Sequence, residues 1–400
     1  MSGPVRVVRG EVIGVVGAGA MGSGIAQVAA AAGHRVILAD AVAGTTARAR
    51  MNIESSLNRL IEKDKIDAAA RDAIIARIAF VVPALGNDVS AFEACDMVIE
   101  AIVEDLAAKK QLFAALSERM KPGAILASNT SSLSIASIAS AARNPERVIG
   151  VHFFNPAPIL PLVEIVPWLG TSPAIATKTR ALVDSWSKST VLAADTPGFI
   201  VNRVARPFYG EALRIYDEGV ADFATIDWAM KELGGFKMGP FELMDFIGND
   251  VNFAVTSTMF ESMFWEPRYK PSLTQKRLAE SGFLGRKSGR GYYIYDDGAA
   301  APEPKRDRAL GTRIFERILA MLINEAADAL LYKIASARDI DLAVTKGVSY
   351  PKGLLAWSDE LGSSWAFERL VALQTEYGED RYRPSALLRR VAQSKGKLLK

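Results

Sequence analysis

The sequence contains very little cysteine and histidine, with one cysteine, Cys95, and two histidines in 400 residues. A lone cysteine excludes a disulfide within the chain and any metal site that needs several thiolates. Two histidines are too few for an ordinary zinc centre, so we expect no bound metal. Because proteins of oxidising compartments commonly carry paired cysteines, this scarcity favours a reducing compartment, and we expect a cytoplasmic protein.

An excess of charge of one sign is also absent, as are long hydrophobic runs. The chain has 48 Lys and Arg against 45 Asp and Glu, and no basic tract interleaved with aromatic residues, so nucleic acid is not an expected partner. No apolar run approaches the ~20 residues that a membrane span requires. Residues 1–9 lack the apolar core of a secretion signal. We therefore expect no membrane partner and no secretion.

A glycine-rich loop lies close to the N-terminus, between a short apolar run at residues 11–16 and a helical pattern. The loop reads Gly17-Ala18-Gly19-Ala20-Met21-Gly22. Gly17 permits a tight turn, Gly19 lets a pyrophosphate approach the backbone, and Gly22 allows the helix to pack closely on the strand. The helix N-terminus adds N–H donors and the positive end of a dipole. The pattern predicts a dinucleotide site.

Asp40 ends the next predicted strand, residues 35–39. An acidic residue about twenty positions after the glycine loop is placed to bind the hydroxyls of the adenosine ribose. Its charge would repel a 2′-phosphate, and no arginine follows it immediately, which favours NAD over NADP.

Strand and helix patterns continue to alternate after this point. Strand patterns occur at residues 78–82, 97–102 and 125–128, and the clearest helix covers residues 107–120. This alternation predicts an α/β fold with a doubly wound, Rossmann-type parallel sheet. Ligands of such a sheet lie beyond the carboxyl ends of its strands.

Two further predicted strands, residues 148–154 and 162–166, each carry one ionisable residue among apolar neighbours: His152 in the first and Glu164 in the second. A lone buried carboxylate is costly, so Glu164 needs a partner, and His152 lies one strand away. Such a pair holds one imidazole nitrogen as a donor and leaves the other for proton transfer. It is equally compatible with a satisfied core pair that has no catalytic role.

The stretch after Asp40 shows a long helical pattern, residues 42–65, with more basic side chains than a crossover helix needs. These are Arg48, Arg50, Arg59, Lys63 and Lys65. The pattern fits an ordinary solvated helix face, and it fits equally a surface that binds a phosphorylated ligand.

From about residue 196 the pattern is helical throughout. Thr196 followed by Pro197 is typical of a helix start. Helical patterns then cover residues 203–218, 225–233 and 239–258. A glycine-rich basic loop runs into an aromatic, strand-like segment at residues 285–295, and residues 299–306 are typical of a linker.

Beyond the linker the sequence repeats itself at an offset of 114 residues. The matches are Glu211-Ala212 with Glu325-Ala326, Ile226-Asp227 with Ile340-Asp341, Gly239 with Gly353, Asp245 with Asp359 and Gly248 with Gly362. Because these are turn, cap and packing positions, a helical unit has been duplicated, although Glu316 replaces Asn202. We expect the helix around residues 314–331 to pack on that around 204–215 with approximate twofold symmetry, so that the second copy replaces a dimer partner.

Taken together, these residues resemble the 3-hydroxyacyl-CoA dehydrogenases of β-oxidation type. The resemblance rests on residues 17–22, Ser128-Asn-Thr-Ser-Ser132, His152-Phe-Phe-Asn-Pro156, Glu164, Pro197-Gly-Phe-Ile-Val-Asn-Arg203, Met238-Gly-Pro-Phe-Glu-Leu243 and Gly285-Arg-Lys-Ser-Gly-Arg-Gly291. It implies an NAD-binding Rossmann-like domain at residues 1–195 and a helical C-terminal domain at 196–298. Residues 308–400 resemble the second helical repeat of longer bacterial members and of multifunctional β-oxidation enzymes.

The resemblance implies reversible, NAD-dependent oxidation of (S)-3-hydroxyacyl-CoA to 3-oxoacyl-CoA, in fatty-acid β-oxidation or a related acyl-CoA degradation. His152 would take the hydroxyl proton as hydride leaves carbon 3 for the nicotinamide. Glu164 would orient the imidazole and stabilise its cation, and Ser131 and Asn202 would hold the reacting oxygen and His152.

Other positions match the family's cofactor and substrate contacts. Those that match NAD-contacting or nearby positions, besides the glycine loop, are Asp40, Glu104, Lys109, Ser131, Asn155 and Lys287. Ser56 and Lys63 match positions where the family's long helix touches CoA, which favours the ligand-binding interpretation of the basic stretch. A homo-oligomer through other faces is compatible with this assignment.

Two other functions share parts of the pattern. A dehydrogenase of a free hydroxy acid, such as gulonate or carnitine, has the glycine loop and the His–Glu pair but should not need Ser56 and Lys63. Proteins of this fold also serve as structural lens proteins, but the intact His152, Glu164 and Asn202 argue against that role. The acyl group stays open between 3-hydroxybutyryl, 3-hydroxyadipyl and longer chains.

Overall fold

The computed structural model describes residues 10–82, 88–296 and 298–399. The chain divides into two compact units, Met1–Thr196 and Pro197–Lys400, each with its own core. Residues 1–9, for which no secretion signal was expected, lie outside the described part. Each unit is considered by itself below.

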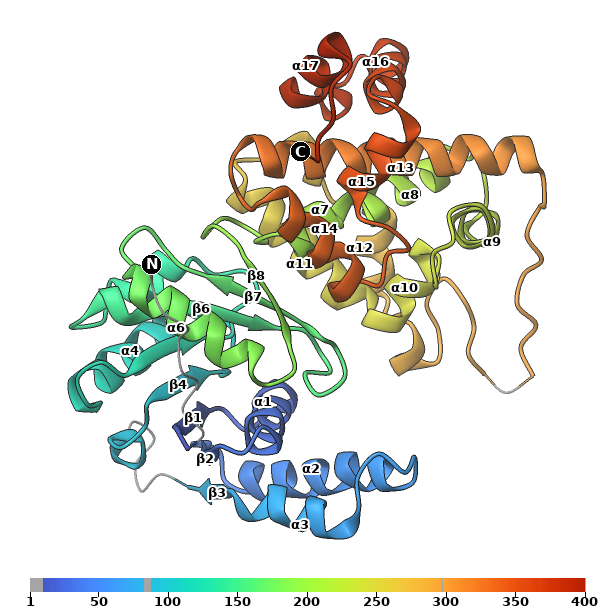
Figure 1. The fold of residues 1–400 in the computed structure, drawn as a ribbon. Coiled ribbons are helices and arrows are strands. Elements are labelled where there is room, and N and C mark those ends of the chain that lie inside the picture. The colour runs from blue at the N-terminus through green and yellow to red at the C-terminus, as the bar shows by residue number, and fades with distance from the viewer. Residues whose placement is uncertain (1–9, 83–87, 297, 400) are drawn as a thin grey trace. The chain divides into compact units, whose positions relative to one another are not determined.

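The first unit is built on an eight-stranded sheet in the order β3-β2-β1-β4-β5-β6-β7-β8 (Figure 1). The strands are β1 Val12–Val16, β2 Arg35–Ala39, β3 Ile78–Val81, β4 Met97–Glu100, β5 Ile125–Ser128, β6 Val148–Phe153, β7 Leu162–Val166 and β8 Ser189–Leu192. The first six are parallel, β7 runs antiparallel to β6, and β8 is parallel to β7. The predicted doubly wound, Rossmann-type sheet is confirmed, and β8 is a strand that the sequence analysis missed.

Helices connect and cover these strands because their apolar faces pack on the apolar strands. They are α1 Ala20–Ala31, α2 Thr45–Ile61, α3 Ala68–Ala76, α4 Leu106–Arg119, α5 Ile135–Ala139 and α6 Pro173–Asp184, with short 3-10 turns η1 Ser90–Phe92 and η2 Pro145–Arg147. Helix α2 is shorter than the predicted residues 42–65. It starts after Gly44, whose φ is +77°, and the chain turns again at Asp64, whose φ is +53°. Both left-handed residues lie outside the helix and limit it.

The second unit begins with a group of helices that corresponds to the first copy of the repeat. Its elements are α7 Val201–Val204, α8 Arg206–Asp217, α9 Phe223–Trp228, the π-helical turn η3 Ala229–Leu233, α10 Pro240–Ile247, α11 Asn249–Ser262, η4 Pro267–Tyr269, α12 Leu273–Glu280 and η5 Arg286–Ser288.

Three local predictions in this region are wrong, each for a backbone reason. The helix does not start at Thr196, because Gly198 and Phe199 adopt left-handed φ values of +74° and +46° and α7 begins only at Val201. The helical pattern of residues 239–258 is two helices, since Gly248 has a φ of +106°. The strand-like segment at residues 285–295 makes only isolated β-bridges.

The second copy follows as α13 Arg308–Leu331, α14 Ala337–Gly347, α15 Leu354–Leu361, α16 Trp365–Tyr377, η6 Asp380–Tyr382 and α17 Ala386–Ser394. Equivalent side chains make equivalent bonds in the two copies. Asp227 accepts hydrogen bonds from the backbone of Phe241 and Glu242, at the start of α10. The Asp341 carboxylate does the same at the start of α15, with Leu355 and Ala356.

Helix α13 packs along α8, and the contacts between them are reciprocal, as the repeat predicted. Arg203 Nε lies 2.8 Å from Glu325 Oε1, and Arg317 Nε lies 2.6 Å from Glu211 Oε1. Both members of one pair stand 114 residues from those of the other. The relation between the two copies is therefore an approximate twofold.

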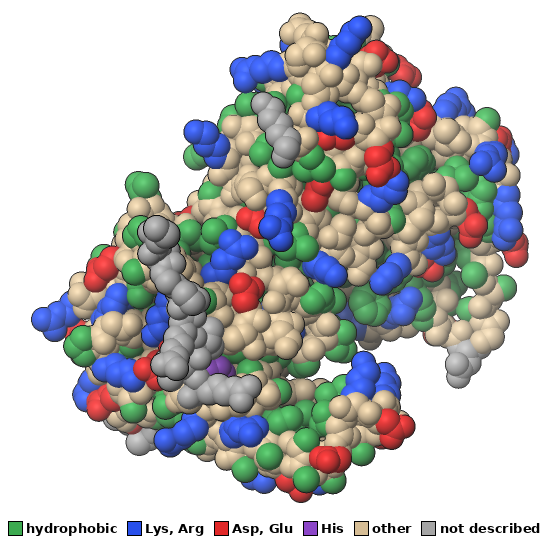
Figure 2. All heavy atoms as spheres, viewed as in Figure 1, with side chains coloured by type: hydrophobic (Ala, Val, Ile, Leu, Met, Phe, Trp, Pro, Cys, Tyr) green, Lys and Arg blue, Asp and Glu red, His purple; other side chains and the backbone are tan. Residues whose placement is uncertain are grey.

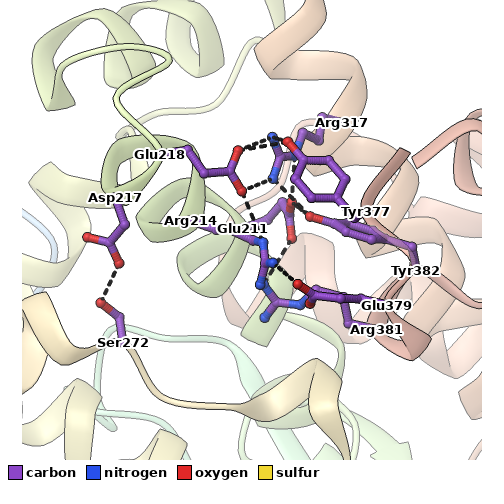
Figure 3. A network of polar contacts seen from close by, with 10 residues as sticks. All are labelled: Glu211, Arg214, Asp217, Glu218, Ser272, Arg317, Tyr377, Glu379, Arg381 and Tyr382. Carbon is purple, nitrogen blue, oxygen red and sulfur yellow. Dashed lines mark hydrogen bonds and ion pairs between the residues drawn. The ribbon is translucent and has the colours of Figure 1, made fainter. Parts of the chain in front are cut away.

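Figure 3 shows one half of this arrangement around Arg317. Its guanidinium bonds Glu211, Glu218 and the hydroxyls of Tyr377 and Tyr382. Burial opposes the charge, but Glu218, Glu211 and Tyr382 hold the pKa of Arg317 above its ordinary value. A cation buried with this many acceptors fixes the register of the two copies, because a shift would leave it unpaired.

On the face drawn in Figure 2, basic and acidic side chains are interspersed. None of the described helices is long and apolar enough to cross a membrane. The described residues also contain no group of three or more His, Cys, Asp and Glu side chains that could hold a metal ion.

Candidate functional site

The glycine loop forms a tight turn between β1 and α1. Gly17 has a φ of +98°, and a Cβ there would lie 2.5 Å from the carbonyl oxygen of Ala101. A Cβ on Gly22 would lie 1.7 Å from the carbonyl oxygen of Gly17. Around Gly19, in contrast, nothing lies within 4 Å of a Cβ position. Two glycines are thus required by packing, while the third leaves the N-terminus of α1 open to a ligand.

Asp40, at the end of β2, is bonded to the backbone on both sides. Its Oδ2 accepts the N–H of Ala18 at 2.7 Å, and its Oδ1 accepts the N–H of Val42 at 2.8 Å. The carboxylate therefore fixes the glycine loop against the end of β2. Each of its oxygens has a further lone pair, so it can also accept hydrogen bonds from ribose hydroxyls.

A buried ion pair lies at the carboxyl ends of β4 and β5. Lys109 Nζ is 2.5 Å from Glu100 Oε1 and 3.1 Å from Glu104 Oε2, and both Lys109 and Glu100 are almost completely buried. Glu100 also accepts the hydroxyl of Ser128 at 2.6 Å. The charge of the Lys109 ammonium is therefore already compensated by two carboxylates.

Glu104 organises the loop that follows β5. Its Oε1 accepts the hydroxyl of Thr130 at 2.5 Å, the hydroxyl of Ser132 at 3.0 Å and the N–H of Ser131 at 3.1 Å. Burial disfavours the charged carboxylate, but Lys109 and these donors hold the pKa of Glu104 below its ordinary value. A charged Glu104 thus fixes the backbone that carries Ser131.

His152 and Glu164 face each other across the antiparallel pair β6 and β7. They are register partners, and His152 Nδ1 lies 2.7 Å from Glu164 Oε2. Both side chains are buried, with relative exposures of 7% and 0%. Because directly opposed residues on antiparallel strands project to the same face, the strand register itself forms this pair.

The bond between these side chains has a chemical consequence. A neutral imidazole that donates Nδ1–H to the carboxylate carries its lone pair on Nε2, which makes Nε2 the basic nitrogen. When Nε2 takes up a proton, the carboxylate beside Nδ1 stabilises the resulting cation. The arrangement can therefore act as a general base with a fixed orientation. Nearby, Asn155 is exposed and its peptide bond to Pro156 is cis.

The surface of α2 carries acidic as well as basic side chains. Ser56 is half-buried on the helix, whereas Lys63 is exposed beyond its end. A groove of about 500 Å³ is lined by Arg50, Glu54, Asn58, Arg71, Asp72, Ile75 and Ala76, between α2 and α3. Arg50 pairs with Glu54 at 3.0 Å there. Ser56 is two residues from both Glu54 and Asn58, which line the groove. Because residues two apart on a helix are rotated by about 200° around its axis, Ser56 faces away from the groove.

Two predicted site residues, Asn202 and Lys287, belong to the second unit. Asn202 lies on α7, and Lys287 on η5 forms an ion pair of 2.7 Å with Asp250. In the first unit the glycine loop, Asp40, Glu104 and Ser131 follow the carboxyl ends of strands of one sheet, Lys109 on α4 pairs with Glu104, and the His152–Glu164 pair lies on two further strands of that sheet.

Sequence reasoning did not assign a role to Glu100 or Ser128, although Ser128 ends one predicted strand and Glu100 lies near the end of another. Their bonds to each other and to Lys109 form the base of the loop that carries Ser131. A buried glutamate at a strand end with a lysine nine positions later was the available signal, because such a carboxylate needs a cation.

Comparison with protein families gives two matches. The family described as "3-hydroxyacyl-CoA dehydrogenase, NAD binding domain" matches residues 12–196. The family described as "3-hydroxyacyl-CoA dehydrogenase, C-terminal domain" matches twice, at residues 198–295 and 314–398.

Individual proteins agree with these matches. A 3-hydroxyadipyl-CoA dehydrogenase of Escherichia coli is 38% identical, over 96% of this chain and 97% of the relative. A 3-hydroxybutyryl-CoA dehydrogenase of Mycobacterium tuberculosis is 40% identical, over 71% of this chain and 98% of its own length. The crystal structure of a 3-hydroxybutyryl-CoA dehydrogenase from Escherichia coli superposes with a TM-score of 0.90 at 38% identity, covering 96% of this chain and 98% of that one.

The geometry of Asp40 predicts the effect of removing its charge. We expect Asp40→Asn to weaken NADH binding about 10- to 100-fold, since hydrogen bonds to a charged group contribute roughly 1.5–3 kcal/mol. NADPH binding should fall less, because the repulsion of the 2′-phosphate is also removed. Fluorescence titration gives both dissociation constants. Asp72→Asn, on the exposed surface of α3, is the control, and an unchanged ratio of the two constants in Asp40→Asn would contradict the assignment.

Proposed function

The chain belongs to the 3-hydroxyacyl-CoA dehydrogenase family of NAD-dependent oxidoreductases, and we propose that His152 and Glu164 perform its proton transfer. The observation that carries this proposal is the 2.7 Å bond between two buried side chains that are direct cross-strand partners. The reaction is the reversible oxidation of a 3-hydroxyacyl-CoA to a 3-oxoacyl-CoA.

The first unit fits the cofactor. The open N-terminus of α1 at Gly19 suits a pyrophosphate, and Asp40 suits the adenosine ribose. When bound, NAD accepts the hydride that leaves carbon 3 of the substrate. We propose that Glu104 and Lys109 support this site by holding the loop of Ser131.

The proton moves separately from the hydride. We propose that His152 Nε2 takes the proton of the 3-hydroxyl group, while Glu164 holds Nδ1 and balances the charge of the imidazolium. In the reverse direction the imidazolium returns the proton to the oxygen of the 3-oxo group. Ser131 and Asn202 are proposed to bond the reacting oxygen and the imidazole, and Asn155 and Lys287 to contact the cofactor.

The substrate's CoA portion is proposed to contact Ser56 and Lys63. Arg50 is already paired with Glu54 and lines the groove toward α3, so the proposal rests on Ser56 and Lys63. A dehydrogenase of a free hydroxy acid is the alternative, and the turnover of acetoacetyl-CoA against free acetoacetate separates the two. We propose a cytoplasmic role in fatty-acid β-oxidation or a related acyl-CoA degradation.

The second helical copy is proposed to replace a twofold partner. The reciprocal pairs Arg203–Glu325 and Arg317–Glu211 are what a self-complementary interface provides, here within one chain. The Mycobacterium tuberculosis relative aligns over 98% of its own length but over only 71% of this chain, so it is too short to contain both copies.

The proposed base can be tested with the two histidines of the chain. His152→Ala should lower kcat about 10²–10⁴-fold, the usual contribution of general acid–base catalysis, with NADH affinity nearly unchanged. Glu164→Gln should also be slow, and its pH profile should shift because the imidazolium loses its counter-charge. His34→Gln, a change of the other buried histidine, is the control. Near-normal turnover of His152→Ala would show that another group is the base.

The contact with CoA can be tested through ionic strength. Lys63→Glu should raise KM for acetoacetyl-CoA, and more at low salt, because exposed charges are screened over about 10 Å at 0.1 M. NADH binding should not change. Lys270→Glu, an exposed lysine of the second unit, serves as control. An unaltered KM at low ionic strength would leave the basic surface without a role in binding.

Truncation tests the role of the second copy. A chain that ends at Gly298 exposes the face of α8 that α13 covers, including Glu211 and Ile215, both buried in the full chain. We expect this fragment to pair or aggregate and to melt at a lower temperature than the full chain. Light scattering gives its mass, and calorimetry its Tm. A monomeric fragment of unchanged Tm would contradict the proposal.

A further inference from the structure

A buried arginine of the second unit has no carboxylate partner. Arg206, the first residue of α8, is only 6% exposed. Its Nε donates to the carbonyl oxygen of Asn202 at 3.0 Å, and its Nη1 donates to the hydroxyl of Thr256 at 3.1 Å. Nη2 has no acceptor among the residues that the structure describes. The acceptors present are neutral, so the charge of Arg206 is not balanced.

Unlike Arg206, the other buried arginines of this unit each have a carboxylate nearby. Arg203 faces Glu325 at 2.8 Å, Arg268 faces Asp328, and Arg381 lies 4.0 Å from Glu211. Arg206 has instead the ring of Tyr209, 4.8 Å from its Cζ. The hydroxyl of Tyr350, which raises the pKa of Arg206, is buried without a hydrogen-bond partner. Burial lowers the pKa of Arg206, and within the described residues only these tyrosines oppose that effect.

An unbalanced cation in a protein interior costs several kcal/mol, which an anion placed against it would recover. Arg206 therefore requires an explanation other than stability. Its free Nη2 hydrogens and the unpaired Tyr350 hydroxyl are donors suited to a carboxylate, which accepts bonds from a guanidinium in a planar, paired geometry.

The duplication supplies an internal comparison. Helices α8 and α13 are equivalent, and the position equivalent to Arg206, at the same offset of 114, is Ala320, which is fully buried. The position equivalent to Asn202 is Glu316. The packing of the helix thus does not need an arginine there. The copy that has lost the asparagine has lost the arginine as well, which links both residues to the site rather than to the fold.

Arg206 follows Asn202 by four residues and is bonded to its carbonyl oxygen at 3.0 Å, so the two residues lie close together. In the proposed function Asn202 bonds the oxygen on carbon 3 of the substrate. We propose that Arg206 binds a carboxylate at the far end of the acyl group, so that the preferred substrates are 3-hydroxyacyl-CoA esters of dicarboxylic acids. This inference rests on the proposed function and adds the residue that selects the acyl group.

In a six-carbon dicarboxylic acyl group the terminal carboxyl carbon stands three carbons beyond carbon 3. Arg206, anchored to the carbonyl oxygen of Asn202, would meet this carboxylate while the oxygen on carbon 3 remains at Asn202. A methyl group at the same position would leave the guanidinium desolvated and without an anion.

Two substrates of equal length test this assignment. With NADH, kcat/KM is measured for 3-oxoadipyl-CoA, whose acyl chain ends in a carboxylate, and for 3-oxohexanoyl-CoA, whose chain ends in a methyl group. We expect the unmodified enzyme to favour the first substrate about 10- to 100-fold, chiefly through KM. This is the gain in affinity that hydrogen bonds between charged groups commonly give. Arg206→Met should bring the ratio close to one, and Arg206→Lys should retain part of the preference.

The control is Arg214→Met on the same helix, an arginine that already pairs with Glu218 and Glu379. It should keep the substrate ratio of the unmodified enzyme. Equal efficiency of the unmodified enzyme on both substrates, or an unchanged ratio in Arg206→Met, would overturn the role of Arg206. Because the first of these outcomes needs no variant, poor folding of Arg206→Met leaves the test intact. Turnover of neither substrate would instead contradict the proposed function.

Discussion

A carboxylate that is removed from water must meet a cation or several donors, and this requirement shapes both units of the protein. In the first unit Glu100 meets Lys109, and Glu164 meets His152. In the second unit Glu211 meets Arg317, and Glu325 meets Arg203. The same constraint fixes a loop in one place, the orientation of an imidazole in another and a helix interface in a third.

Most strands of the first unit could be predicted because they are short apolar runs. The glycine loop could be predicted because a Cβ at Gly17 or Gly22 would collide with the backbone, so these positions must be glycine. The repeat was also visible in the sequence, because residues that make the same capping bond in both copies, such as Asp227 and Asp341, have been kept. The strand β8 was missed because its sequence, Ser-Thr-Val-Leu, begins with two polar residues and so does not form the continuous apolar run of the equally short β3, β4 and β5.

Other features depended on backbone conformation or on contacts between distant residues. Nothing in the pattern of residues 239–258 shows that Gly248 adopts a φ of +106° and divides the helix. The pairing of Asp40 with the N–H of Ala18 joins residues 22 apart, and that of Glu104 with Ser132 joins residues 28 apart. The residue types predicted a site. Which backbone and side-chain groups Asp40 and Glu104 bond to could be learned only from the structure. The unbalanced charge of Arg206 likewise becomes visible only when its neighbours are known.

The reciprocal pairing of α8 with α13 has a consequence for how this protein responds to dilution and to mutation. An interface between separate subunits dissociates as concentration falls, but one between two parts of a single chain does so only when the chain unfolds. In a homodimer every substitution also appears on both sides of the twofold axis. Here Arg317 can change without Arg203 changing, so each half of the interface is able to evolve independently of the other.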